Sequence, residues 1–296
     1  MRVTEENAED EQSGYPVVTH PIRNGRYAVK DKYLADFPES ADIETSSADY
    51  AGRFSGAIGT YLLSVQCRII LDMLTDCQGG RLLSIGGGHG QLVEPLVHRG
   101  FEVTVTGSHD ICRERLMRRI QDVPCSYRTC NSIDLPFADG EYDVVMAIRL
   151  LTHVSRWQRL IAEMCRVSNK IVIFDYPDRR SSNILYCLLF PVKKALEGNT
   201  RPFMMFSRAQ LTKELAKNGY GGTVFQPQFF FPMVFHRKLS NPHLSNILET
   251  GARLIGLTNL LGSPIILKSR KMKISANGEA GLLPTSIAKH ISGRAV

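Results

Sequence analysis

Long hydrophobic runs are missing from this chain of 296 residues. The longest apolar stretches cover residues 184–192 and 229–235, far fewer than the roughly 18 residues that a membrane-spanning helix needs, and each contains a proline. The start of the chain also lacks an apolar stretch behind a basic end, because Arg2 is followed closely by Glu5 and Glu6. The sequence therefore predicts neither a membrane-spanning helix nor a signal peptide, and we expect a cytoplasmic protein.

Paired cysteines are missing as well. The seven cysteines are an odd number, and no two of them form a C-x-x-C pair. This pattern fits neither a disulfide framework nor a structural zinc site. We expect free buried thiols and no metal.

The sequence also lacks a group of aromatic side chains on which nucleic-acid bases could stack. The formal net charge of +7 raises nucleic acid or an anionic membrane as partners. However, the basic clusters at residues 113–119, 179–180, 193–194 and 268–271 are not interleaved with aromatic side chains that stack on bases. We therefore expect no nucleic-acid partner, and the cluster at 113–119 is typical of a solvated helix face.

What the sequence does contain is a change of hydrophobic period along the chain. Residues 1–45 are polar and acidic, which predicts a disordered or loosely packed lead. Apolar residues then recur every three or four positions over 58–77, the pattern of an amphipathic helix. Beyond it, short apolar runs alternate with helical stretches; the runs are 82–85, 103–106, 144–148 and 171–174, and the helical stretches are 90–99, 110–121 and 155–167. Strands that alternate with helices imply a doubly wound α/β fold with a mostly parallel sheet.

The second half of the chain has a weaker pattern. It predicts helices at 182–196, bent at Pro191, at 207–218 and at about 243–260, and strands at 223–231 and 264–269. We expect one domain over residues 46–270, with helical insertions at about 178–206 and 232–262. The tail from 271 to 296 is predicted to be disordered.

The strand at 82–85 ends in a turn that contains Gly86, Gly87, Gly88 and Gly90. Such glycines allow a sharp turn and a close approach of a ligand, while the following helix start favours a negative group. A dinucleotide fingerprint would need a further glycine at position 91 or 93, where glutamine and valine stand, and no Lys-Ser or Lys-Thr follows to make a P-loop. The turn therefore predicts a ligand site of another kind at the carboxyl end of this strand.

Four motifs in this order resemble the class I S-adenosylmethionine-dependent methyltransferases, in the subgroup that includes ubiquinone and menaquinone biosynthesis methyltransferases. The turn at 86–90 resembles their G-x-G-x-G loop, and residues 134–145 resemble their LPF-x-D-x-x-F-D-V-V segment. Residues 151–154 resemble L-x-H-V, and 163–167 resemble E-x-x-R-V. The likeness covers about 80–177 and implies a Rossmann-like seven-stranded sheet with a helical lid and caps, and S-adenosylmethionine as cofactor.

The chain departs from this family at two acidic positions. Ser84 stands where the family has an acid in the first strand, and Gly107 stands where a second acid usually holds the ribose. Ser108 or Asp110 is expected to replace it. For adenine the resemblance points to Asn131 and Ser132, since an amide pairs with the adenine edge. The cofactor-binding set is then Gly86, Gly87, Gly88, Gly90, Ser108, Asp110, Asn131, Ser132 and Arg149.

Three residues near the carboxyl ends of the fourth and fifth predicted strands are the catalytic candidates. His153, Asp175 and Tyr176 lie at the edge where an open α/β sheet binds its ligands. A histidine or carboxylate there can take the proton of a methyl acceptor. The alternatives are that His153 bonds the loop backbone or the cofactor, and that Asp175 caps a helix or forms an ion pair.

The acceptor-binding candidates are Tyr50, Arg53, Arg201 and His236. Tyr50 and Arg53 precede the first long helix, where the family places a lid, and the other two lie in the predicted caps. Arginine suits a carboxylate, phosphate or phenolate on the acceptor, although internal salt bridges also explain it. Phenylalanines at 203, 206 and 229–231 line either an acceptor pocket or the core.

The sequence thus predicts a methyltransferase that acts on a small molecule, with a quinone-like, polyketide-like or lipid-linked acceptor. The alternatives are an inactive S-adenosylmethionine-binding or regulatory protein of the same fold, and a nicotinamide-dependent oxidoreductase. A further hypothesis is peripheral membrane contact by the helix at 184–196, which basic residues bracket at 179–180 and 193–194.

Overall fold

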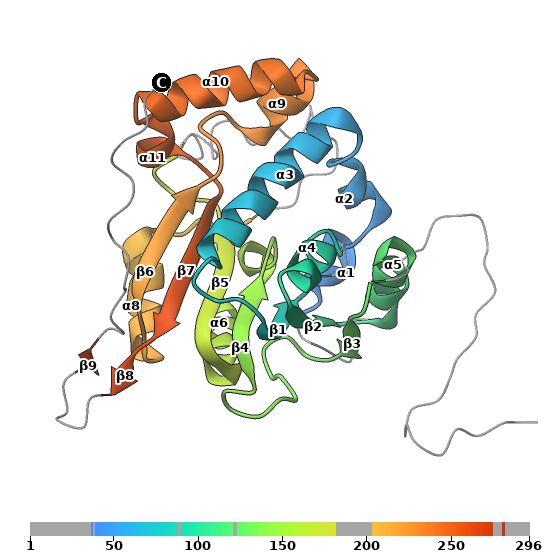
Figure 1. The fold of residues 1–296 in the computed structure, drawn as a ribbon, viewed down its shortest axis with the longest axis vertical. Helices are drawn as coiled ribbons and strands as arrows, with labels where there is room; N and C mark the ends of the chain where they lie inside the picture. Colours follow the sequence, from blue (N-terminus) through green and yellow to red (C-terminus); the bar gives the residue numbers. More distant parts are fainter. Residues whose placement is uncertain are drawn as a thin grey trace, which may run out of the picture. The chain divides into compact units, whose positions relative to one another are not determined.

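A seven-stranded sheet with the strand order β3-β2-β1-β4-β5-β7-β6 organises the fold (Figure 1). The strands are β1 (Gly80–Ile85), β2 (Phe101–Gly107), β3 (Ser126–Thr129), β4 (Tyr142–Ala147), β5 (Ser168–Tyr176), β6 (Tyr220–Pro227) and β7 (Ile265–Lys271). β7 pairs antiparallel with β5 and β6, and the pairs among β1 to β5 are parallel. This confirms the predicted doubly wound, mostly parallel sheet, whose ligands are expected at the carboxyl ends of its parallel strands.

Helices cover both faces of the sheet because successive strand residues point to opposite sides. Leu82 of β1 packs with α3, α4 and α5, whereas its neighbour Leu83 packs with α6 and α8. The helices are α1 (Ala41–Thr45), α2 (Ala48–Gly52), α3 (Gly56–Met73), α4 (Val93–His98), α5 (Asp110–Ile120), the short 3-10 helix η1 (Leu151–His153), α6 (Trp157–Val167), α8 (Arg208–Lys217), α9 (Met233–Leu239), α10 (Pro242–Leu254) and α11 (Leu257–Leu261).

This computed structural model describes residues 37, 39–87, 90–120, 123–181, 203–274 and 280–281. The predicted helix at 182–196, and with it the proposed membrane contact, lies outside the described residues. Within the described part of the chain, no helix has both the length and the apolar character needed to cross a bilayer.

Described elements lie beyond two of the predicted domain boundaries. The lead was expected to be loose up to residue 45, but Glu39 is buried and accepts hydrogen bonds from Ser155 and Arg156. Helix α1 then packs Ala41 into the main core. At the other end, the tail from 271 includes two short paired strands, β8 (Lys273–Ile274) and β9 (Ala280–Gly281). The sequence pattern does not show these elements, because they have too few residues to show a period.

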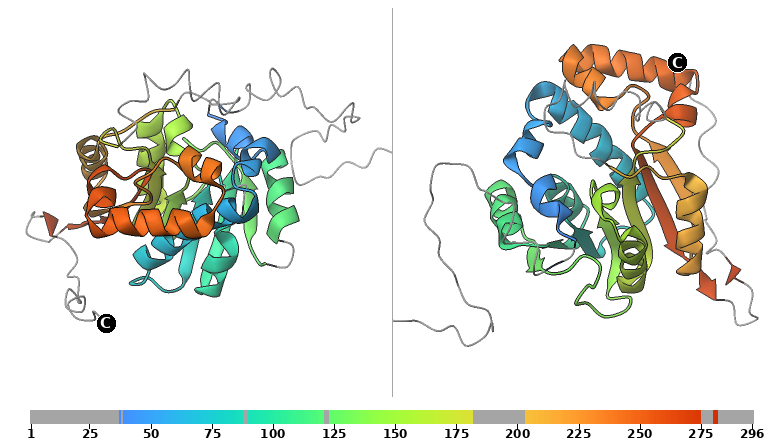
Figure 2. Two further views of the ribbon diagram at one scale, coloured as in Figure 1. Left: turned by 90° about the horizontal axis from the view of Figure 1, so that it is seen from above. Right: turned by 180° about the vertical axis from the view of Figure 1, so that it is seen from behind.

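Helices α9, α10 and α11 lie between β6 and β7 in the chain, and together we call them the cap. They lie beyond the carboxyl ends of the parallel strands, with α10 outermost in the side views (Figures 1 and 2). Aromatic contacts join the cap to α3, since the Tyr61 ring lies 6.2 Å from Phe229 and 6.3 Å from His236, measured between ring centroids. The cap is therefore attached at the same edge of the sheet as the predicted ligand site.

Candidate functional site

The glycine turn after β1 opens at the carboxyl edge of the sheet. Gly86 has a φ of +66°, a left-handed conformation that favours glycine, and its N–H donates to the Thr106 carbonyl of β2 at 2.9 Å. A Cβ on Gly87 would lie 2.5 Å from the Ser84 hydroxyl. Ser84 therefore lies against the turn, and at the described positions Gly86, Gly87 and Gly90 the backbone carries no side chain that would obstruct a ligand.

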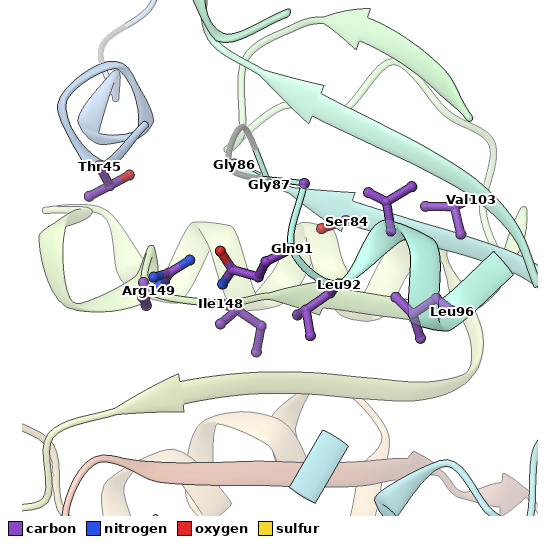
Figure 3. A pocket seen from close by; sticks show the side chains of 12 residues that line it. Thr45, Ser84, Gly86, Gly87, Gln91, Leu92, Leu96, Val103, Ile148 and Arg149 are labelled. Atoms are coloured by element: carbon purple, nitrogen blue, oxygen red, sulfur yellow. The ribbon is translucent and has the colours of Figure 1, made fainter. Parts of the chain in front are cut away.

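A hollow lies beside this turn (Figure 3). Its lining comes from α1, β1, the start of α4, β2 and the end of β4, and consists of Thr45, Ser84, Gly86, Gly87, Gly90, Gln91, Leu92, Val93, Leu96, Val103, Ile148 and Arg149. The structure thus brings together four of the predicted cofactor-binding residues, which are Gly86, Gly87, Gly90 and Arg149. Gly88 lies outside the described residues.

Arg149 is the charged residue of this lining. Its φ is +61°, a conformation that non-glycine residues rarely adopt and that is often found at functional sites. The guanidinium carbon lies 4.8 Å from the centre of the Phe54 ring and 5.8 Å from that of Tyr50. Its Nε is buried without a hydrogen-bond partner, and burial lowers the pKa of the guanidinium. An unpaired buried donor beside the hollow fits a ligand that carries an anionic group.

Asp175 at the end of β5 positions Arg149. Its Oδ1 accepts the backbone N–H of Arg149 at 2.5 Å, and its Oδ2 accepts the Gln66 amide at 3.3 Å. The Gln91 amide in turn donates to Gln66 at 3.4 Å. Burial raises the pKa of Asp175 to about 6. The two glutamines were not predicted, although Gln66 is a polar residue on the apolar face of α3, and that position was the available signal.

The other two catalytic candidates lie apart from this chain of hydrogen bonds. Tyr176 points to the opposite face of β5, where its ring lies 6.3 Å from Phe206 and its hydroxyl is buried without a partner. Burial raises its pKa. His153 ends η1, half-buried, with its backbone N–H donating to Leu150 at 2.9 Å. Neither residue belongs to the lining of the hollow.

A carboxylate from another element, α1, lies at the end of β2, where the second strand itself has no acid. A Cβ on Gly107 would lie 2.2 Å from the Tyr127 hydroxyl and 3.2 Å from an oxygen of Asp42, so no side chain fits there. The Asp42 carboxylate of α1 is buried and accepts the Ser108 amide at 2.6 Å and the Ser108 hydroxyl at 2.5 Å. Asp42 belongs to the segment that was predicted to be loose, and no local pattern identified it.

The remaining predicted cofactor residues make local contacts. Asp110 accepts the Thr129 hydroxyl at 2.6 Å, and both side chains are exposed. The Asn131 side-chain oxygen accepts the Ile133 amide at 3.2 Å, while Ser132 is buried beside it. These residues lie at the carboxyl ends of β2 and β3 but do not line the hollow. Their contacts with adenine and ribose stay predictions.

The predicted acceptor residues separate into two groups. Arg53 lies 5.2 Å from the centre of the Tyr50 ring, and the same ring lies 5.8 Å from the Arg149 guanidinium, although neither Tyr50 nor Arg53 lines the hollow. His236 is instead fully buried in the cap, where its Nε2 lies 2.9 Å from Glu249. The structure therefore places His236 in the cap interior, while Arg201 lies outside the described residues.

The chain is similar to known proteins in sequence and in fold. Residues 83–172 match the family described as "Methyltransferase domain". A curated relative, phosphatidylethanolamine N-methyltransferase of Cereibacter sphaeroides, is 32% identical over 101 residues. The matched segment covers 32% of this chain and 48% of the relative, so the chain spans about half the length of that relative.

Two solved structures resemble the whole domain. Magnesium protoporphyrin IX methyltransferase from Synechocystis PCC 6803, with bound SAH, has a TM-score of 0.53 at 13% identity and covers 78% of this chain and 97% of its own. Geranyl diphosphate C-methyltransferase from Streptomyces coelicolor A3(2) has a TM-score of 0.51 at 17% identity, covering 70% of this chain and 76% of its own. At these identities the likeness shows the fold, and it confirms the fold that the motifs predicted.

Proposed function

Since the chain has the class I methyltransferase fold and a methyltransferase domain over residues 83–172, we propose that it transfers a methyl group from S-adenosylmethionine to a lipid or other small-molecule acceptor. The observation that carries this proposal is the hollow at the glycine turn, because a half-buried cation, Arg149, lies beside it with its buried Nε unpaired. A hollow that served only as a gap in packing would not hold Arg149 at a cost in desolvation and backbone conformation.

The residues present fit the cofactor. Gly86, Gly87 and Gly90 would hold its methionine portion against the backbone of the turn, and Asp42 would accept its ribose hydroxyls beside Ser108. When bound, S-adenosylmethionine supplies a methyl group on a good leaving group, so the protein mainly has to align the acceptor and exclude water. The aromatic rings of Tyr50 and Phe54 cover Arg149 and would serve the exclusion of water.

Arg149 and Asp175 would act at the acceptor. Asp175 holds the backbone of Arg149, which orients the guanidinium toward an anionic group such as a phosphate or carboxylate. With a pKa of about 6, Asp175 is ionised at neutral pH and would favour the departure of a proton from the acceptor. The curated relative is named for phosphatidylethanolamine, and this supports a phospholipid acceptor among the predicted classes.

Calorimetric titration of the full chain with S-adenosylhomocysteine tests the cofactor, with NAD as the comparison for the oxidoreductase alternative. Transfer of labelled methyl groups to a panel of phospholipids, quinones and free amines then tests the acceptor. We expect binding of S-adenosylhomocysteine, no binding of NAD, and label in the phospholipid fraction. Binding without transfer to any extractable small molecule would instead favour the inactive binding protein.

Arg149→Met tests whether the charged residue beside the hollow also binds the acceptor. It keeps an unbranched side chain about as long as the aliphatic part of arginine and removes the charge. We expect the affinity for an anionic acceptor to fall at least about tenfold, the usual loss when a charge-assisted hydrogen bond is removed. Arg156→Met, which changes an exposed arginine outside the hollow, is the control. Equal acceptor affinity in both variants would remove Arg149 from the acceptor site.

A further inference from the structure

Helix α10 presents apolar side chains to solvent. Its buried face consists of Ser245, Glu249 and Ala252. The opposite face carries Ile247 and Leu254, which are 66% and 82% exposed. A surface helix of a globular domain normally has the reverse arrangement, with its apolar stripe toward the core.

The exposed apolar side chains concentrate in the cap. Eight large apolar residues of the described part of the chain are exposed, and only Met117 and Val224 lie elsewhere. The other six define what we call the cap face: Phe235, Leu244, Ile247, Leu254, Ile255 and Leu260. Single exposed apolar residues are ordinary, but a concentration of them on the three consecutive helices of the cap marks an interaction surface.

The charges around the cap face have one sign. Lys238 and Arg253 are exposed on the same helices. The single acidic residue between Pro227 and Pro264 is Glu249. It is buried and accepts hydrogen bonds from the Phe230 and Phe231 amides at 2.8 and 2.9 Å, so its charge does not face solvent. The cap face is therefore apolar and cationic without an exposed carboxylate.

We propose that the cap face docks on an anionic lipid bilayer. Apolar side chains that enter the interface, together with cations that meet anionic headgroups, are the two contributions that hold a peripheral protein on a membrane. A second copy of the chain fits less well, since a symmetric contact would bring like charges together. The surface is distinct from the segment 184–196, for which membrane contact was predicted from the sequence.

Docking by this face would bring Arg149 and Asp175, where we propose that the acceptor binds, to the side of the molecule that faces the membrane. Helices α9 and α10 of the cap pack on α3, whose Gln66 donates to Asp175 beside Arg149. The cap is thus connected to the site through α3. The inference goes beyond methyl transfer and is tested without cofactor or acceptor, so its failure and that of the proposed function are separate results.

Vesicle sedimentation of the full chain is the first test. We expect binding to vesicles of phosphatidylcholine mixed with phosphatidylglycerol, little binding to phosphatidylcholine alone, and a loss of binding as salt rises. The double variant Ile247→Ser with Leu254→Ser should lower the partition coefficient at least about tenfold, because two apolar side chains no longer enter the interface. The matched control is Met117→Ser with Val224→Ser, which removes two exposed apolar side chains elsewhere and should bind like the natural sequence.

Fluorescence gives a second measurement. The chain has one tryptophan, Trp157, which is buried in the core. Leu254→Trp adds a reporter whose emission should shift to the blue, and be quenched by brominated lipid, only with anionic vesicles. Failure of the natural sequence to bind, unchanged binding of the Ile247 and Leu254 double variant, or a dimer in sedimentation equilibrium that this variant dissociates would each overturn the proposal.

Discussion

Asp42 lies at the end of β2 although it comes from a distant part of the chain, and we propose that it binds the ribose of the cofactor. Its carboxylate lies beside Gly107 at the end of β2, held by both hydrogen-bonding groups of Ser108. We predict that Asp42→Asn lowers the affinity for S-adenosylhomocysteine by about 10- to 100-fold, since hydrogen bonds to a charged group contribute about 1.5–3 kcal/mol. Calorimetry checks this, with Glu44→Gln on the same helix as control. Unchanged affinity in Asp42→Asn would mean that the ribose is held elsewhere.

Asp175 makes a prediction about pH. Its pKa in the folded protein, about 6, is above the ordinary value of 3.8, so the folded state binds more protons than the unfolded state between these values. Stability from this group is therefore present at low pH and is lost as pH rises through about 6. Comparison with Asp175→Asn isolates the effect: the natural sequence should lose about 1 kcal/mol of unfolding free energy relative to the variant between pH 5 and pH 7. Urea unfolding at pH 5 and pH 7 measures the unfolding free energies. The same change with pH in the natural sequence and in Asp175→Asn would contradict the prediction.

The sequence identified site residues only where a local pattern marked them. Gly86, Gly87 and Gly90 follow a buried strand, and Arg149 ends another, so their place at one sheet edge could be predicted. Asp42 could not, because its neighbour Ser108 is 66 positions away. Tyr176 was grouped with Asp175 because both end β5, but adjacent strand residues face opposite sides, and this separates them.

At the scale of elements, two sequence motifs are joined by one set of hydrogen bonds. Glu163 of α6 accepts the Leu135 amide at 2.8 Å, and Arg166 donates to the Leu135 and Phe137 carbonyls at 2.8 Å. The loop that enters β4 is therefore fastened to α6. The motif residues at 163–167 thus have a structural role that the sequence alone did not reveal.

This fastening predicts a stability difference between two glutamates. Glu163→Ala should lower the free energy of unfolding by about 3 kcal/mol, because it leaves the buried Leu135 amide without its acceptor and removes one of the two carboxylates that pair with the partly buried Arg166. Glu114→Ala removes a carboxylate that pairs with Arg118 on the surface of α5, and should change it by about 0.5 kcal/mol or less. Urea unfolding of both variants measures the two losses of unfolding free energy. Losses of equal size would show that the hydrogen bonds of Glu163 stabilise the fold no more than a surface ion pair does.

Element length decided which helices and strands could be predicted. The helix at Gly56–Met73 and the strands β1, β2, β4 and β5 have enough buried residues to show their period. β3 is a four-residue edge strand without a fully buried position, and α1 and α2 have five residues each. Their placement depends on tertiary contacts such as that of Asp42, which no window of sequence contains.

At the scale of the whole molecule, the proposed cofactor site joins parts that are far apart in the chain. The hollow is lined by residues from Thr45 to Arg149, and α1 also packs on α5 beside it. A ligand that binds only the folded state stabilises all of it, by about 2.7 kcal/mol at 100 times the dissociation constant. The midpoint temperature of thermal unfolding of the full chain should therefore rise with the concentration of S-adenosylhomocysteine.

Hydrogen exchange tests whether α1 contacts the ligand together with the glycine turn. If Asp42 contacts the ligand, S-adenosylhomocysteine should slow amide exchange in residues 41–52 as well as in the glycine turn, because opening of α1 would then require loss of the ligand. In Asp42→Asn the turn should keep part of its protection while residues 41–52 lose theirs. Protection confined to the turn in the natural sequence would show instead that α1 only packs beside the site, and that the ribose is held by groups on the sheet.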